Sequence, residues 1–173
     1  MSFEVGDAIV YGGSGVCEID GIESISFYHE RPQKYYVLKP MFVKQSSVVY
    51  VPMNNEEQVS KIKPVISKQE AIKLIKQIPL KGGEWIEDRN ARRDAFNDIV
   101  NTGSRKEIVK LISLIESHKD ALAEEGKRLN TQDERVLSEA MRRISAEFAV
   151  ALDMEPEEIN EIIRSDELKA KLA

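Results

Sequence analysis

The chain has 173 residues, 42% of them hydrophobic and 32% charged, which is typical of a folded globular protein and argues against disorder or a fibrous repeat. Its net charge of -5 at pH 7 argues against a protein that holds nucleic acid by long-range attraction alone. The single cysteine, Cys17, excludes an internal disulfide, and no apolar run is long enough to cross a bilayer, so we expect a cytoplasmic protein without membrane contact.

The N-terminal part of the chain, residues 1–64, contains short runs rich in β-branched and aromatic residues, separated by turn residues. Residues alternate between two faces near its end, where Val49 and Val51 fall on one face and Val48 and Tyr50 on the other. Strands this short and this numerous predict a small SH3-like or Tudor-like β-barrel.

In the remainder of the chain, residues 67–173, the hydrophobic period becomes helical. Two Ser/Thr-x-x-Glu patterns, Ser67 with Glu70 and Thr131 with Glu134, predict capping boxes at helix starts. Helices are expected at residues 67–78, from Glu87 or Asp88 to Asn101, after a cap at Ser104, after a cap at Thr131 and as far as Leu152, and from Pro156 onward. The sequence therefore predicts an α+β protein in which the barrel precedes a bundle of about five helices.

The chain shows no residue pattern typical of an enzyme or a metal site. The glycine-rich stretch at residues 12–15 lacks the Gly-Lys-Ser/Thr ending of a phosphate-binding loop and is interpreted as a turn. His29 and His118 lie in different predicted domains without a nucleophile or ligand at a recognisable spacing, and both are interpreted as ordinary surface histidines. We therefore expect no catalytic activity, no cofactor and no bound metal.

The only tryptophan, Trp85, begins the strongest constellation of the sequence. If the segment after it is helical, Trp85, Arg89 and Arg92 share one side, with Arg93 adjacent. Arginines hold phosphates, and an apolar ring wedges into a base step, so this arrangement is typical of DNA contact. The alternative is that Trp85 packs in the core beside Phe96 with the arginines at the rim, because tryptophan is largely buried on average.

A second basic set lies on and before the predicted fourth helix. Arg135 and Arg142 are seven residues apart and therefore fall on one face. Acidic residues such as Glu139 interleave with them, so a solvated helix face competes with a DNA-binding patch. Residues 68–146 carry 16 basic and 14 acidic side chains, so we expect any DNA contact there to be weak and to need a second anchor.

The order of several motifs along the chain points to a known family. In chain order they are FEVGDAIVYGGSGVCEIDGIE, YYVL, VYVPMNN, GGEW, GSRKEIVKLI and TQDERVLSEAMRRISAEFAVAL. In this combination the chain resembles the CarD family of bacterial transcription regulators over nearly its whole length. The Gly6-Asp7 start also resembles the polymerase-interacting domain of transcription-repair coupling factors, which continue into a motor whose motifs this sequence lacks.

The resemblance implies a monomeric regulator that binds the RNA polymerase β subunit through its barrel and promoter DNA through its helices. Trp85 is then the wedge in the minor groove at the upstream edge of the melted region, where it slows bubble collapse, and the arginines near it hold phosphates. The expected DNA-binding residues are Trp85, Arg89, Arg92, Arg93, Arg135 and Arg142. The polymerase supplies the second anchor, so low intrinsic affinity for DNA suffices.

The resemblance also implies that an edge of the barrel pairs with the β subunit by strand addition, with Phe27 and Tyr50 as side-chain anchors. The expected polymerase-binding residues are Ile25, Phe27, Val48, Tyr50 and Pro52. The chain departs from the family pattern in its 12–14 turn and at Glu134, which stands where a basic DNA contact is expected. A rival hypothesis is a protein-protein adaptor with a Tudor-like barrel and Trp85 buried in the helical core.

Overall fold

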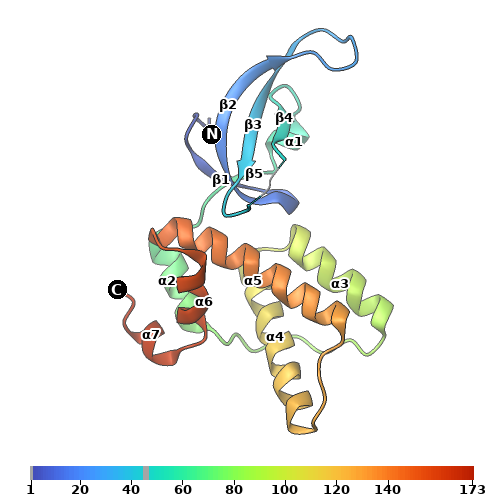
Figure 1. Ribbon diagram of the computed structural model, residues 1–173, viewed down its shortest axis with the longest axis vertical. Coiled ribbons are helices and arrows are strands. Elements are labelled where there is room, and N and C mark those ends of the chain that lie inside the picture. Colours follow the sequence, from blue (N-terminus) through green and yellow to red (C-terminus); the bar gives the residue numbers. More distant parts are fainter. Residues whose placement is uncertain (1, 45–46) are drawn as a thin grey trace. The chain divides into compact units, whose positions relative to one another are not determined.

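The computed structural model describes residues 2–44 and 47–173 and divides into two compact units, Met1–Ile66 and Ser67–Ala173 (Figure 1). We call them the N-terminal and the C-terminal unit and describe each by itself. The α+β class is confirmed, because strands form the first unit and helices the second. Within the described residues, no helix combines the length and the hydropathy that crossing a membrane requires.

The N-terminal unit is built on a five-stranded antiparallel sheet with the order β4-β3-β2-β1-β5. Its strands are β1 (Ala8–Tyr11), β2 (Gly15–Ile25), β3 (Gln33–Pro40), β4 (Val49–Pro52) and β5 (Ile62–Pro64), with a short 3-10 turn at Gly12–Ser14 and a one-turn helix α1 (Glu56–Val59). The sheet is open, with β4 and β5 as its two edges, so the closed barrel expected from the sequence is not confirmed. An open edge leaves backbone groups available for pairing with another chain.

One face of this sheet carries the core of the N-terminal unit. The buried residues of this core are Ile9, Cys17, Ile19, Tyr36, Leu38, Val51 and Ile62. The alternation predicted around β4 is confirmed, because Val49 and Val51 pack toward the core while Val48 and Tyr50 are each 39% exposed. Strand β2 changes register between Ile19 and Gly21, and beyond this bulge it pairs only with β3 among the described strand pairs.

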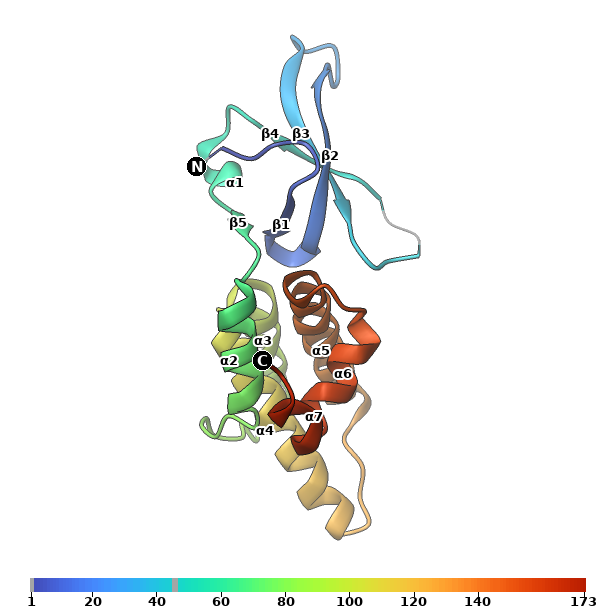
Figure 2. The same cartoon turned by 90° about the vertical axis from the view of Figure 1, so that its left-hand side faces the viewer.

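The C-terminal unit contains six helices. They are α2 (Lys68–Gln77), α3 (Arg89–Thr102), α4 (Arg105–Glu124), α5 (Thr131–Leu152), α6 (Pro156–Ile163) and α7 (Asp166–Ala170). Helix α5 packs against α2, α3, α4 and α6 (Figures 1 and 2). The sixth helix, α7, has only five residues, too few for a hydrophobic period to be read from the sequence.

Side-chain caps set most helix starts of the C-terminal unit. Ser67 accepts from the backbone N–H of Glu70, which confirms the predicted N-cap of α2, and Ser104 caps α4 in a reciprocal capping box. The predicted box of Thr131 with Glu134 is wrong. The N-cap of α5 is instead Asn130, one residue earlier, whose side chain accepts from the backbone N–H of Asp133, because asparagine is itself a preferred N-cap.

Candidate functional site

Trp85 lies in an irregular segment between α2 and α3, outside any helix. Asp88 caps α3 by accepting from two backbone N–H groups, so the helix begins at Arg89. The helical row that was expected to align Trp85 with Arg89 and Arg92 is therefore wrong. The indole is positioned by contacts with side chains of the bundle instead.

Aromatic rings of two helices hold the indole of Trp85. The ring of His118, on α4, stacks on it with 3.7 Å between centroids and 9° between planes. Phe96, on α3, meets it edge to face at 5.6 Å. Trp85 is only half-buried, so it is neither a core residue nor a freely exposed one. This geometry holds the ring against the bundle and leaves part of it at the surface.

Arg92 is buried and contacts both the Trp85 ring and the backbone that follows it. Its guanidinium lies 4.8 Å from the centroid of the Trp85 ring and forms a bidentate ion pair with Asp133 of α5, with both N···O distances 3.0 Å. It also donates to the backbone carbonyls of Ile86 at 2.8 Å and Glu87 at 3.3 Å. Arg92 thus fixes the two residues that follow Trp85 in the chain.

The predicted phosphate contact of Arg92 requires its guanidinium to lie at the surface. In the structure Arg92 is buried. The residue is only 6% exposed, and its guanidinium is engaged by one carboxylate and two carbonyls. A buried charge is tolerated when it is paired and hydrogen-bonded in this way. Arg92 therefore positions the Trp85 segment and does not face a ligand.

The start of the same segment is anchored as well. The N–H of Leu80 donates to the hydroxyl of Ser113 on α4 at 3.0 Å, and that hydroxyl donates to the carbonyl of Val109. Gly82 and Gly83 follow with φ of 141° and 85°, conformations that residues with a side chain rarely adopt. The chain is thereby redirected from α2 toward Trp85 without a regular element.

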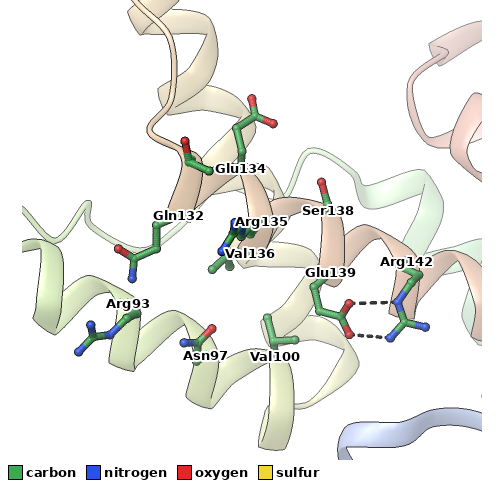
Figure 3. A pocket seen from close by; sticks show the side chains of 11 residues that line it. Arg93, Asn97, Val100, Gln132, Glu134, Arg135, Val136, Ser138, Glu139 and Arg142 are labelled. Carbon is green, nitrogen blue, oxygen red and sulfur yellow. Dashed lines mark hydrogen bonds and ion pairs between the residues drawn. The ribbon is translucent and has the colours of Figure 1, made fainter. Parts of the chain in front are cut away.

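Three of the predicted DNA-binding arginines line one groove between α3 and α5, of about 980 Å³ (Figure 3). Arg93 extends from α3, and Arg135 and Arg142 come from α5, as their seven-residue spacing predicted. Glu139 shares the groove and forms a bidentate ion pair with Arg142, which raises the pKa of that arginine. The groove therefore presents cations whose charge is partly compensated by acidic neighbours.

Other groups complete the picture of this groove. Asn97 of α3 and Gln132 of α5 reach toward it from opposite walls, and Glu134 lies at its rim with an ion pair to Lys119 (Figure 3). The amide nitrogen of Gln132 is buried without a hydrogen-bond partner. Arg89, the first residue of α3, is exposed and is not part of the groove lining. Asn97 and Gln132 were missed because uncharged amides give no charge pattern in the sequence.

Of the predicted polymerase-binding residues, Ile25, Tyr50 and Pro52 lie on the sheet face opposite the core, whereas Val48 precedes β4 and is exposed. Pro52 pairs with Tyr35, Tyr50 with Val37 and Ile25 with Gln33, and directly paired residues point to the same face. Phe27 lies 5.4 Å from Tyr35 and 5.8 Å from Tyr50 between ring centroids, in edge-to-face contacts. We call Phe27, Tyr35 and Tyr50 the aromatic cluster.

Tyr35 was missed as a member of this cluster, although the sequence contains a signal for it. Adjacent residues of a strand point to opposite faces, so of the neighbours Tyr35 and Tyr36 only one enters the core. Tyr36 is the buried one, at 7% exposure, and Tyr35 faces the other side with Tyr50. The aromatic cluster includes Tyr50 of the edge strand β4, where an added strand would pair.

The fold and these surfaces define a two-unit protein, with an open antiparallel sheet that carries exposed aromatic rings and a helical bundle that carries a half-buried tryptophan and a basic groove. Residues 3–63 match the family model of the CarD-like/TRCF RID domain, so the N-terminal unit carries this domain, and the match supports a CarD-like family protein. This domain indicates an RNA polymerase-interacting, transcription-related protein. A search of curated proteins finds no match to the chain.

Proposed function

We propose that the protein regulates bacterial transcription in the cytoplasm by binding the RNA polymerase β subunit with its N-terminal unit and promoter DNA with its C-terminal unit. The observation that carries this proposal is the family match of residues 3–63. The bundle is then the DNA-binding part, and Trp85 wedges into the minor groove at the upstream edge of the melted region.

The environment of Trp85 supports the wedge. The ring is held by His118 and Phe96, and the backbone of the two residues that follow it is held by Arg92, so little side-chain freedom is lost when the ring meets DNA. An apolar ring gains contact only where a base step is already unstacked, which gives a preference for open over closed promoter. A ligand shifts such an equilibrium by its difference in affinity for the two states.

The arginines supply the phosphate contacts of this proposal. Arg93, Arg135 and Arg142 line the groove between α3 and α5, and Arg89 is exposed at the start of α3. Acidic residues share the groove, so the intrinsic affinity for DNA is low. Polymerase binding raises the effective concentration of the C-terminal unit at the promoter and compensates for this weakness.

The polymerase contact is proposed at the edge strand β4. A strand of the β subunit pairs with its open edge, and Phe27 and Tyr50 of the aromatic cluster contact side chains beside it. Tyrosine and phenylalanine are enriched in the cores of protein interfaces, where they bury large area at small entropic cost.

The adaptor hypothesis retains one supporting observation, because the stack of Trp85 on His118 is also what a packing tryptophan would form. Measuring the lifetime of promoter open complexes distinguishes the wedge hypothesis from the adaptor hypothesis. We expect the wild-type protein to prolong it and a folded Trp85→Ala variant to lose most of that effect, on the order of tenfold for one stacking contact. Equal lifetimes with the two proteins would refute the wedge, and no effect of either would favour the adaptor.

A further inference from the structure

The loop between β2 and β3 contains a tight turn with an unusual sequence. The N–H of Glu30 donates to the carbonyl of Phe27 at 3.0 Å, and the two residues between them, Tyr28 and His29, have φ of 52° and 65°. Positive φ at both central residues is the pattern of a type I′ turn, for which Asn-Gly is strongly preferred. Tyrosine and histidine are strained in this conformation, since a side chain disfavours the left-handed region.

The ring of Tyr28 contributes little to the fold. Its exposure is 95%, more than that of any other large hydrophobic residue within the described ranges, whereas the neighbouring Phe27 packs against Tyr35 and Tyr50. A strained residue whose side chain lies in solvent is not explained by packing. Such outliers persist at functional sites, where the strain holds a group in a useful direction.

The turn is the tip of a projecting two-stranded arm. Strand β1 pairs with β2 only as far as Glu18, while the pairs of β2 with β3 continue to Ile25 and Gln33 (Figure 2). Strand β4 runs toward this tip, because Pro52, its last residue, pairs with Tyr35 near the start of β3. A strand added at the edge of β4 therefore follows the aromatic cluster in the direction of Tyr28.

We propose that Tyr28 is an anchor residue for RNA polymerase, with its ring inserted into a pocket of the β subunit next to the strand that pairs with β4. This inference rests on the proposed function. The contact surface then extends from the β4 edge across the aromatic cluster to the tip of the arm. The fixed backbone of the turn presents the ring in one direction, which reduces the ordering that binding requires.

Two matched substitutions in the turn separate the effect of removing the Tyr28 ring from the effect of relieving the backbone strain. Tyr28→Asn removes the ring, and His29→Gly keeps it, while each introduces a residue that a type I′ turn prefers. Both variants of the full chain are expected to slow hydrogen exchange of the β2 and β3 amides. Only Tyr28→Asn is expected to weaken binding to purified RNA polymerase, by about tenfold or more, as for an aromatic hot spot. Tyr28→Phe should stay within about threefold of wild type, since the ring supplies most of the contact.

Phe42 provides the control, because it is also exposed, at 48%, with a positive φ of 60°, but follows the opposite end of β3. Phe42→Asn should leave polymerase affinity unchanged. If Tyr28→Asn binds like wild type while Tyr50→Ala binds weakly, the inference about Tyr28 is wrong and the polymerase contact at β4 stands. Weaker binding together with faster exchange would assign the effect to the turn and also overturn the inference. If the wild type does not bind polymerase, the proposed function fails and the inference with it.

Discussion

Replacing Arg92 by alanine tests whether this residue positions the Trp85 segment. The substitution leaves Asp133 as an unpaired buried carboxylate and removes the donors to the carbonyls of Ile86 and Glu87. Breaking a buried ion pair from one side costs about 3 to 5 kcal/mol. Arg92→Ala should therefore lower the unfolding free energy of the C-terminal unit by that amount, a large part of the total stability of a domain.

Urea unfolding followed by tryptophan fluorescence measures this effect directly, because Trp85 is the only tryptophan and lies in the C-terminal unit. Arg93→Ala is the matched control, since Arg93 is half-exposed and pairs with the exposed Asp94, so its loss should change stability by less than about 1 kcal/mol. The double variant Arg92→Ala, Asp133→Ala should lose less than the two single variants together. A stability of Arg92→Ala within about 1 kcal/mol of wild type, combined with weaker DNA binding, would refute the positioning role.

Three further predictions concern other parts of the chain. Arg135→Gln should weaken DNA binding equally on all sequences and reduce the slope of log affinity against log salt by about 1, measured with polymerase-free promoter fragments. His118→Ala should make Trp85 fluorescence more accessible to iodide, whereas His118→Phe, which keeps a stacking ring, should not. Burial raises the pKa of Cys17 from 9.0 to about 11, so its neutral thiol stabilises the fold below about pH 9 and this contribution is lost as the pH rises toward 11. The stability difference between wild type and Cys17→Ala should therefore shrink over that range in urea unfolding.

Local sequence signals predicted the helices of the C-terminal unit well. Ser67 and Ser104 cap the helices for which they were proposed, and Pro156 occupies the first turn of α6. These signals act within one helical turn, so they can be read without knowledge of the tertiary structure. The N-cap of α5 was misplaced by one residue because Asn130 and Thr131 are both acceptable caps.

Local sequence signals of this kind could not predict the contacts of Trp85. The spacing of Trp85, Arg89 and Arg92 suggested one helical face, but Asp88 starts the helix only after the tryptophan. Arg92 meets Asp133 across 41 positions of the chain, and no local pattern identifies such a partner. The same limit applies to the sheet. Period-two alternation is a local pattern and predicted the strands, but whether the sheet closes into a barrel depends on how its edge strands lie in three dimensions.

Within the proposed function, the stack on His118 has two opposite effects on the wedge. It holds the indole in place, yet it covers one face of the ring, so a base step gains contact only with the remaining surface or must displace the imidazole. An aromatic pair of this kind is worth about 0.5 to 1.5 kcal/mol beyond its buried area. Displacing it subtracts a similar amount from a stacking gain of about 1 to 3 kcal/mol per base. The small net gain is insufficient for stable binding to free DNA, and it becomes effective once polymerase holds the protein beside an already unstacked step.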